Sequence, residues 1–152
     1  MPTVYDVPAD KLIEKTAEYL RENIEDIRPL PWSVFVKTGS HLKHPPQNQD
    51  YWYIRSASIL RKIYVNQFIG IERLRKEYGG RTSKGTVGKH KRRSGGAIIR
   101  NILKQLEKSE LVVTVDKKGR KITDKGKSIL DRLAMQVLVN LEKEQPELKK
   151  YM

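Results

Sequence analysis

The chain has 152 residues, a length that one domain commonly accommodates, so we expect a single domain over 1–152. The lack of cysteine excludes disulfides and thiolate metal sites, and no apolar run is long enough to cross a membrane. The sequence carries 31 Lys and Arg against 18 Asp and Glu, a formal net charge of +13, so we expect a polyanionic partner. The N-terminus lacks the charged and then apolar pattern of a secretory signal peptide, so we expect a soluble cytoplasmic protein.

The positive charge is concentrated in the middle of the chain. Residues 1–50 carry 6 basic and 8 acidic side chains, residues 51–100 carry 13 and 2, and residues 101–152 carry 12 and 8. So many like charges repel one another in a compact fold unless a polyanion neutralises them, and nucleic acid is the usual polyanionic partner. A solvated charged surface is the alternative interpretation, but its charges would be evenly mixed in sign.

The N-terminal part predicts two helices with a turn and a loop between them. Residues 10–24 place apolar side chains on one stripe at helical spacing, with Asp10 at the expected N-cap. A helical turn is predicted over 32–37, and the prolines and polar residues of 40–49 indicate a loop. Residues 50–66 carry a second apolar stripe, with basic side chains outside it at Arg55, Arg61 and Lys62.

The central part predicts a short helix, a basic loop and a longer helix. The short helix covers 70–78 and is terminated by two glycines. Residues 81–93 hold six fixed positive charges and no acid, and their Ser, Thr and Gly content indicates a loop. Ser94 is then the expected cap of a helix over 94–108 with a clear apolar stripe.

After Ser109 the apolar period changes from that of a helix to that of a strand. Residues 111–115 and 120–123 flank a turn whose glycine is placed for a positive φ, which predicts a short hairpin. The final helix begins near Thr123 and Asp124 and continues with an apolar stripe until a proline at 146.

The order of these elements is that of a winged helix-turn-helix, in which the third helix and the hairpin commonly contact nucleic acid. We therefore predict a mainly α, winged-helix-like fold with one short β-hairpin and extra N-terminal helices. The linker before the third helix is long and basic, whereas a protein that reads DNA needs a tight turn there. The sequence thus favours folded RNA over the DNA major groove.

The basic loop predicts phosphate binding by simple electrostatics. Lysines supply point charges, and arginines can donate two parallel hydrogen bonds to phosphate oxygens. Gly85 and Gly88 would let the backbone approach the phosphates closely. A mobile, solvated loop is the alternative for the protein without RNA. We expect the cations of the loop, two helices and the hairpin to lie on one surface. Those of the loop are Arg81, Lys84, Lys89, Lys91, Arg92 and Arg93.

Trp52 has two possible roles. With Tyr51 and Tyr53 it opens a helix that carries basic residues, and aromatic rings can stack on unpaired bases. A tryptophan at the start of a helix is more often part of the core, where it would orient the basic face. Both interpretations stay open at this stage.

Catalytic and metal chemistry find no support in the sequence. The only histidines, His41, His44 and His90, fall in predicted loops without acid or thiol ligands beside them. The glycines around Lys89 lack the preceding strand and the following Ser or Thr of a phosphate loop. We expect no enzyme activity, no metal and no cofactor.

Four segments resemble, in the same order, the small-subunit ribosomal protein nineteen-e family of archaea and eukaryotes. The matching segments are 52–64, Tyr78-Gly-Gly-Arg81, 94–107 with Ser94-Gly and Arg100, and Gly119-Arg120-Lys121-Ile-Thr123 with Gly126. Gly88 stands where eukaryotic members tend to have proline, and 66–69 replaces a glycine-rich stretch. The sequence therefore looks like an archaeal member.

The resemblance implies a structural protein in the head of the small ribosomal subunit, on the RNA of its 3′ domain, with a part in subunit maturation. The implied partners are small-subunit rRNA and neighbouring small-subunit proteins, with no membrane and a monomer outside the ribosome. The RNA-facing candidates carried over by position, with the hairpin lysine, are Trp52, Arg55, Arg61, Lys62, Arg81, Arg100, Arg120 and Lys121. A winged-helix transcription regulator that binds DNA as a dimer is the alternative, because the hairpin-then-helix ending is common among such proteins.

Overall fold

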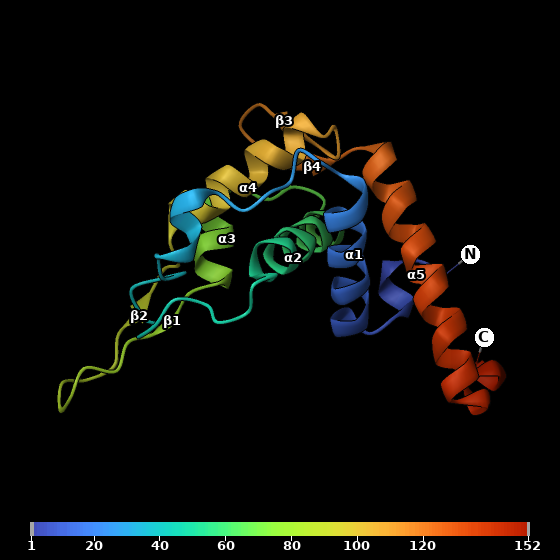
Figure 1. The fold of residues 1–152 in the computed structure, drawn as a ribbon, viewed down its shortest axis with the longest axis horizontal. Helices are drawn as coiled ribbons and strands as arrows, with labels where there is room; N and C mark the ends of the chain where they lie inside the picture. Colours follow the sequence, from blue (N-terminus) through green and yellow to red (C-terminus); the bar gives the residue numbers. More distant parts are fainter. Residues whose placement is uncertain (1, 152) are drawn as a thin grey trace.

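The computed structural model describes residues 2–151 and contains five α-helices and two small antiparallel sheets in that part of the chain (Figure 1). The helices are α1 (Ala9–Asn23), α2 (Tyr51–Asn66), α3 (Ile71–Glu77), α4 (Gly96–Lys108) and α5 (Asp124–Glu144). Strands β1 (Gly80–Arg81) and β2 (Lys91–Arg92) form one sheet, and β3 (Val112–Val115) and β4 (Gly119–Ile122) form the other. The 3-10 turns are η1 (Val4–Asp6), η2 (Pro31–Val34) and η3 (Pro146–Tyr151).

Helices α2, α3 and α4, followed by the hairpin β3–β4, form the predicted winged-helix arrangement. The wing, β3–β4, is joined to the connection between α2 and α3 by a β-bridge. In this bridge the backbone N–H of Ile69 donates to the carbonyl oxygen of Arg120 at 3.1 Å, and the return bond from Arg120 to Ile69 is 2.9 Å. The bridge fixes the wing against the helices, because both backbone groups of each residue are paired.

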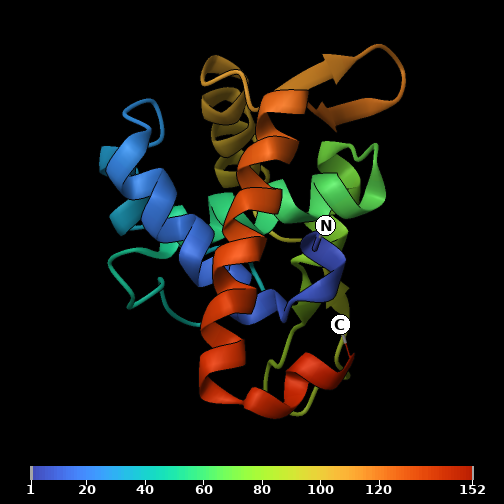
Figure 2. The ribbon, with the colours of Figure 1, turned by 90° about the vertical axis from the view of Figure 1, so that its right-hand side faces the viewer.

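Helices α1 and α5 cover the side of α2 that faces away from β1 and β2 (Figures 1 and 2). The Nζ atom of Lys11 on α1 donates to Glu144 on α5 at 2.8 Å. Thr123 caps α5, because its hydroxyl oxygen accepts the backbone N–H of Gly126. The extra N-terminal helix predicted from the sequence is thus confirmed as part of the helical body.

The core is one cluster of apolar side chains drawn from all the long helices and from the wing. Trp52 is its largest member and is 0% exposed. The apolar stripe predicted for α4 faces this cluster, and its buried members are Ile98, Ile99, Ile102, Leu103 and Leu106. The remaining side of α4 is left to polar and charged residues.

Three details predicted for the elements are wrong, namely two helix caps and one segment assigned wholly to a loop. Ser94 does not cap α4, which begins at Gly96 after the N-cap Gly95, because Ser94 pairs with Gly39 in a β-bridge and is held in extended backbone. Pro8, and not Asp10, occupies the N-cap position of α1. Residues 81–93 are not wholly a loop, since β1 and β2 form a two-residue ladder there.

Candidate nucleic-acid interface

The segment between α3 and α4 extends from the helical body as a narrow hairpin, which we call the basic arm (residues 80–92) (Figure 1). Gly80 pairs with Arg92 and Arg81 with Lys91. Beyond this ladder, the backbone N–H of Thr82 donates to the carbonyl oxygen of His90 at 2.9 Å. The arm therefore has a paired base, and its outer residues make few bonds to the rest of the chain.

Two glycines allow the base of the arm to pack closely. A Cβ atom at position 79 would lie 2.2 Å from the carbonyl oxygen of Arg92. A Cβ atom at position 80 would lie 2.8 Å from the ring of His41. A larger residue at position 79 would clash with backbone, so glycine is required there, whereas at position 80 the ring of His41 would have to shift.

The basic arm carries five of the predicted site residues as exposed cations: Arg81, Lys84, Lys89, Lys91 and Arg92. None of the five forms an ion pair with another residue in the range 2–151. Their charges are uncompensated within the protein and project from the body together, so they are available to a polyanion.

Arg93, the sixth cation of the predicted loop, is exposed, but its charge is paired within the protein. It pairs with Glu72 on α3, and Arg75 also donates to Glu72, at 3.0 Å. These contacts hold the pKa of Glu72 below its usual value, with the hydrogen bond from Arg75 as the largest cause. Arg75 further donates to the carbonyl oxygen of Ser94 at 3.0 Å, so this cluster fixes the arm to α3.

Arg100 continues the positive surface from the base of the arm onto α4. A Cβ atom at position 96 would lie 3.0 Å from Nη1 of Arg100 and 3.3 Å from Cδ of Arg75, so the two arginines approach each other over the first turn of the helix. Lys104 lies one turn further along and is also exposed. We call Arg100 and Lys104 the α4 stripe. Lys104 is a further candidate that was not predicted, although its i, i+4 spacing from Arg100 was a usable signal.

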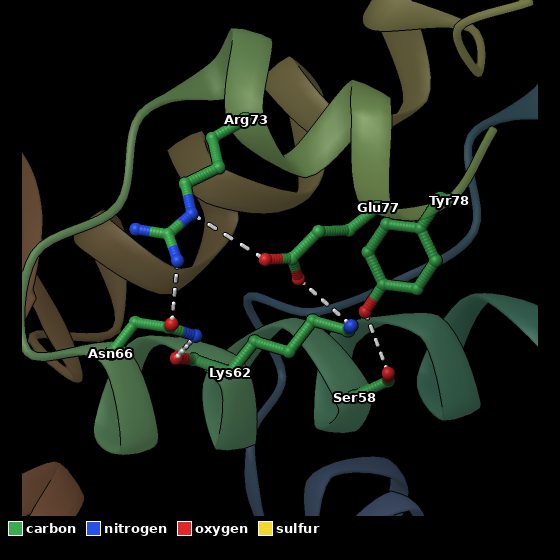
Figure 3. A network of polar contacts seen from close by, with 6 residues as sticks. All are labelled: Ser58, Lys62, Asn66, Arg73, Glu77 and Tyr78. Atoms are coloured by element: carbon green, nitrogen blue, oxygen red, sulfur yellow. Dashed lines mark hydrogen bonds and ion pairs between the residues drawn. The ribbon is translucent and has the colours of Figure 1, made fainter.

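The cations of α2 lie behind this surface. The guanidinium carbon of Arg55 lies 4.1 Å from the centre of the Tyr78 ring, and the Nζ atom of Lys62 lies 4.9 Å from it. Lys62 also donates to Glu77 at 2.9 Å, and Tyr78 shares a hydrogen bond of 2.6 Å with Ser58 (Figure 3). Arg55 and Lys62 therefore fasten α3 to α2, and their charges are partly compensated.

Figure 3 also shows how Arg73 and Asn66 complete this contact between α2 and α3. Arg73 donates to the side-chain oxygen of Asn66 at 3.1 Å and lies 3.5 Å from Glu77. Arg61, the remaining basic residue predicted on α2, is half-buried, and its Nε atom is buried without a hydrogen-bond partner in the described part of the chain.

The two predicted residues of the wing point in different directions. The Nε atom of Arg120 donates to Glu107 of α4 at 3.1 Å, and Thr114 of β3 donates to the same carboxylate. Lys121 is exposed and lies over Phe68, 5.9 Å from the ring centre, because successive residues of a strand face opposite sides. The expectation of one common cationic surface is therefore only partly correct, since Lys121 is on another side of the wing.

Trp52 does not belong among the RNA-contacting candidates. Its side chain is 0% exposed, packs edge-on against Trp32 with ring centres 6.2 Å apart, and donates from Nε1 to Gln105 of α4 at 2.8 Å. An unpaired base cannot stack on a ring that has no exposed face. The core interpretation of this tryptophan is the correct one.

Neither a metal site nor a membrane-spanning helix is found among the described residues. Within 2–151, no group of three or more His, Asp or Glu side chains is placed to hold a metal ion. No helix in the same range is long and apolar enough to span a bilayer.

The fold and the basic arm define a winged-helix-like protein with an unusually cationic extension. Residues 3–140 match the family described as ribosomal protein S19e. The chain belongs to the ribosomal protein S19e family, as an archaeal member. The resemblance that the sequence segments carry is confirmed.

Named relatives match over almost their whole length. The small ribosomal subunit protein eS19 of Aeropyrum pernix is 44% identical, with 100% of both chains covered. The protein of the same name from Haloarcula marismortui is 41% identical, with 99% of each chain covered. The eS19A protein of Schizosaccharomyces pombe is 36% identical over 90% of this chain and 94% of its own.

Membership of this family decides between the functional classes considered for the sequence. The family consists of structural ribosomal proteins, so the chain is a ribosomal protein and not an enzyme. Family membership also favours a ribosomal protein over a DNA-binding regulator, although proteins of both classes share the winged-helix-like fold.

Proposed function

We propose that the protein is a constituent of the small ribosomal subunit that binds small-subunit rRNA through the basic arm and the α4 stripe. The observation that carries the proposal is the group of five exposed arm cations without ion-pair partners among residues 2–151. Phosphate groups would neutralise these charges and release condensed counterions, which is the main source of affinity in such contacts.

The shape of the arm favours folded RNA over a DNA duplex. In a winged-helix protein that reads DNA, a tight turn holds the recognition helix in the major groove. Here the basic arm projects beside the first turn of α4, so its cations would meet a straight duplex before the helix did. Folded RNA offers phosphates on several sides of a narrow projection, which suits an arm of this kind.

The finer assignment follows the resemblance of the sequence to its family. We place the protein on the RNA of the 3′ domain in the head of the small subunit, in the cytoplasm, beside neighbouring small-subunit proteins. A supporting role in late subunit maturation and a monomeric state outside the ribosome belong to the same proposal.

The salt dependence of RNA binding tests the role of the arm. We expect the variant Lys89→Gln, Lys91→Gln, Arg92→Gln to bind small-subunit rRNA more weakly than the wild type. Each phosphate contact contributes roughly 0.7 to 0.9 to the slope of log affinity against log salt, so loss of three contacts should flatten the slope by about 2 to 3. Filter binding or fluorescence titration between low and moderate salt measures both quantities.

A matched control removes the same number of charges elsewhere. Lys143, Lys149 and Lys150 are exposed near the C-terminus, and their change to glutamine should leave the slope close to the wild-type value. Equal slopes for the arm variant and the wild type would show that the arm is not at the RNA.

A further inference from the structure

A hollow of about 360 Å³ lies on another side of the molecule from the basic arm. It is bounded by η1, the end of α2, strand β4 of the wing and the first turns of α5. Figure 2 shows η1 below the wing and the first turns of α5 beside it. Three aromatic rings and two lysines, together with Gln67 and Ile122, form its lining; the rings and lysines are Tyr5, Tyr64, Phe68, Lys121 and Lys127.

One aromatic ring of this hollow is exposed, and the other two are half-buried. Tyr5 is 64% exposed, and its ring centre lies 5.9 Å from that of Tyr64. Phe68 is half-buried and belongs to the connection between α2 and α3. These exposed faces offer stacking surface that the core of the protein does not use.

The charge around the hollow is positive. Lys118 and Lys121 lie 5.2 and 5.9 Å from the Phe68 ring centre. Neither they nor Lys127 form an ion pair with any residue that the structure describes. No carboxylate neutralises these three lysines, so they can bind an anion, while two of them also lie against the Phe68 ring.

Two acids near the rings, Asp6 and Asp131, are hydrogen-bonded within the protein. Asp6 accepts two hydrogen bonds from Thr3, at 2.7 and 3.0 Å. Asp131 accepts the hydroxyl proton of Tyr64 at 2.9 Å. Both acids keep their negative charge, but neither forms an ion pair with a lysine of the hollow within residues 2–151, so the three lysines are not held by carboxylates.

We propose that this hollow binds one unpaired nucleotide of RNA, with its base against Phe68 or Tyr5 and its flanking phosphates on Lys118, Lys121 and Lys127. A volume of about 360 Å³ accommodates a base and its ribose. Aromatic faces beside cations are the usual means of holding unpaired bases. The inference rests on the proposed function, but it concerns a second contact that is independent of the basic arm.

The first test compares two RNA probes on the full chain. One is a stem with a single bulged 2-aminopurine, and the other is the same stem fully paired. Stacking on one ring contributes a factor of about 5 to 150 in affinity, so Phe68→Leu and Tyr5→Ala should weaken binding of the bulged stem within that range. Their affinity for the paired stem should stay unchanged, and the wild type alone should quench the 2-aminopurine fluorescence strongly.

Matched controls separate the hollow from general surface effects. Phe35→Leu changes a ring that is 81% exposed and lies outside the hollow. Lys127→Gln removes one charge of the hollow, and Lys143→Gln, which removes an exposed charge elsewhere on α5, is its control. Both controls should bind the bulged stem like the wild type. Equal losses in the control and hollow variants, or a wild type that binds both stems alike, would overturn the proposal.

The second test uses assembled small subunits, with a photo-crosslinkable benzoylphenylalanine in place of Phe68. The proposal expects an adduct with rRNA at an unpaired position. An adduct with a protein alone would overturn it and assign the hollow to a neighbouring subunit protein. If the hollow variants behave like the wild type while the arm variant still flattens the salt slope, only the second contact fails. If the hollow variants bind like the wild type and the arm variant also keeps the wild-type salt slope, the proposed function itself would be contradicted.

Discussion

At the scale of single residues, the ring of Tyr78 shows how a cation can serve the fold instead of a ligand. Burial raises the pKa of its hydroxyl, which shares a hydrogen bond of 2.6 Å with Ser58. Arg55 and Lys62 lie against the same ring. These side chains hold α3 in the position from which the basic arm leaves, so they act on RNA binding through the geometry of the arm.

Trp52 is expected to affect stability and not RNA contact. Trp52→Phe removes the bond to Gln105 and leaves that side-chain oxygen without its donor, so the free energy of unfolding should fall by about 1–3 kcal/mol. Urea denaturation measures this change. Trp32→Phe, at a ring that is 36% exposed, should cost less. A Trp52→Phe protein of normal stability but reduced RNA affinity would contradict the core role.

Tyr64 gives the stability a dependence on alkaline pH. Burial, helped by the hydrogen bond to Asp131, raises its pKa to about 12. The unfolded chain loses this proton near pH 10, whereas the folded protein keeps it, so the free energy of unfolding falls as pH rises from about 10 through 12. Tyr64→Phe should flatten this part of the stability profile. Tyr53→Phe is the control, and an identical flattening there would argue against the assignment.

At the scale of elements, the wing depends on one glycine. Gly119 has a φ of +104°, and a Cβ atom there would lie 2.6 Å from the carbonyl oxygen of Ile69. Gly119→Ala should therefore lower the free energy of unfolding by more than about 1 kcal/mol. Gly88→Ala places its methyl group in open space and should cost little. Thermal or urea denaturation compares the two, and equal shifts would mean that the bridge to Ile69 does not fix the wing.

The helices and the wing were predictable because their apolar periods and turn residues are local signals. The two-residue ladder of the arm was not, since Arg81 and Lys91 are as polar as any loop residues and pair only through the backbone. The extended backbone at Ser94 depends on contact with Gly39, more than fifty positions earlier in the chain. Neither feature leaves a periodic signal in the sequence.

The candidate site was predictable in composition and only partly in arrangement. Counting charges located the arm, but it could not separate the free Lys89 from Arg93, which pairs with Glu72 on another element. The same limit explains why Arg120 was grouped with Lys121, although their side chains leave the strand on opposite sides. Which cations are free is decided by tertiary contacts with acids and rings.

At the scale of the whole molecule, the charge is divided between two sides. The basic arm projects from the side of α2 opposite to α1 and α5 (Figure 1). Helix α1 instead exposes several acids, namely Glu14, Glu18 and Glu22. Because α1 also carries three basic residues, its net charge is only slightly negative, and a polyanion would be attracted to the arm far more strongly than to α1.

A map of lysine–RNA crosslinks in purified small subunits tests this difference between the arm and α1 most directly. Adducts are expected at Lys84, Lys89 and Lys91 of the basic arm and at Lys104 of the α4 stripe. Lys11 and Lys15, which form ion pairs with Glu144 and Glu18, should give none. Adducts confined to α1, with an arm that remains uncrosslinked, would contradict the central claim that the arm is the RNA-binding surface.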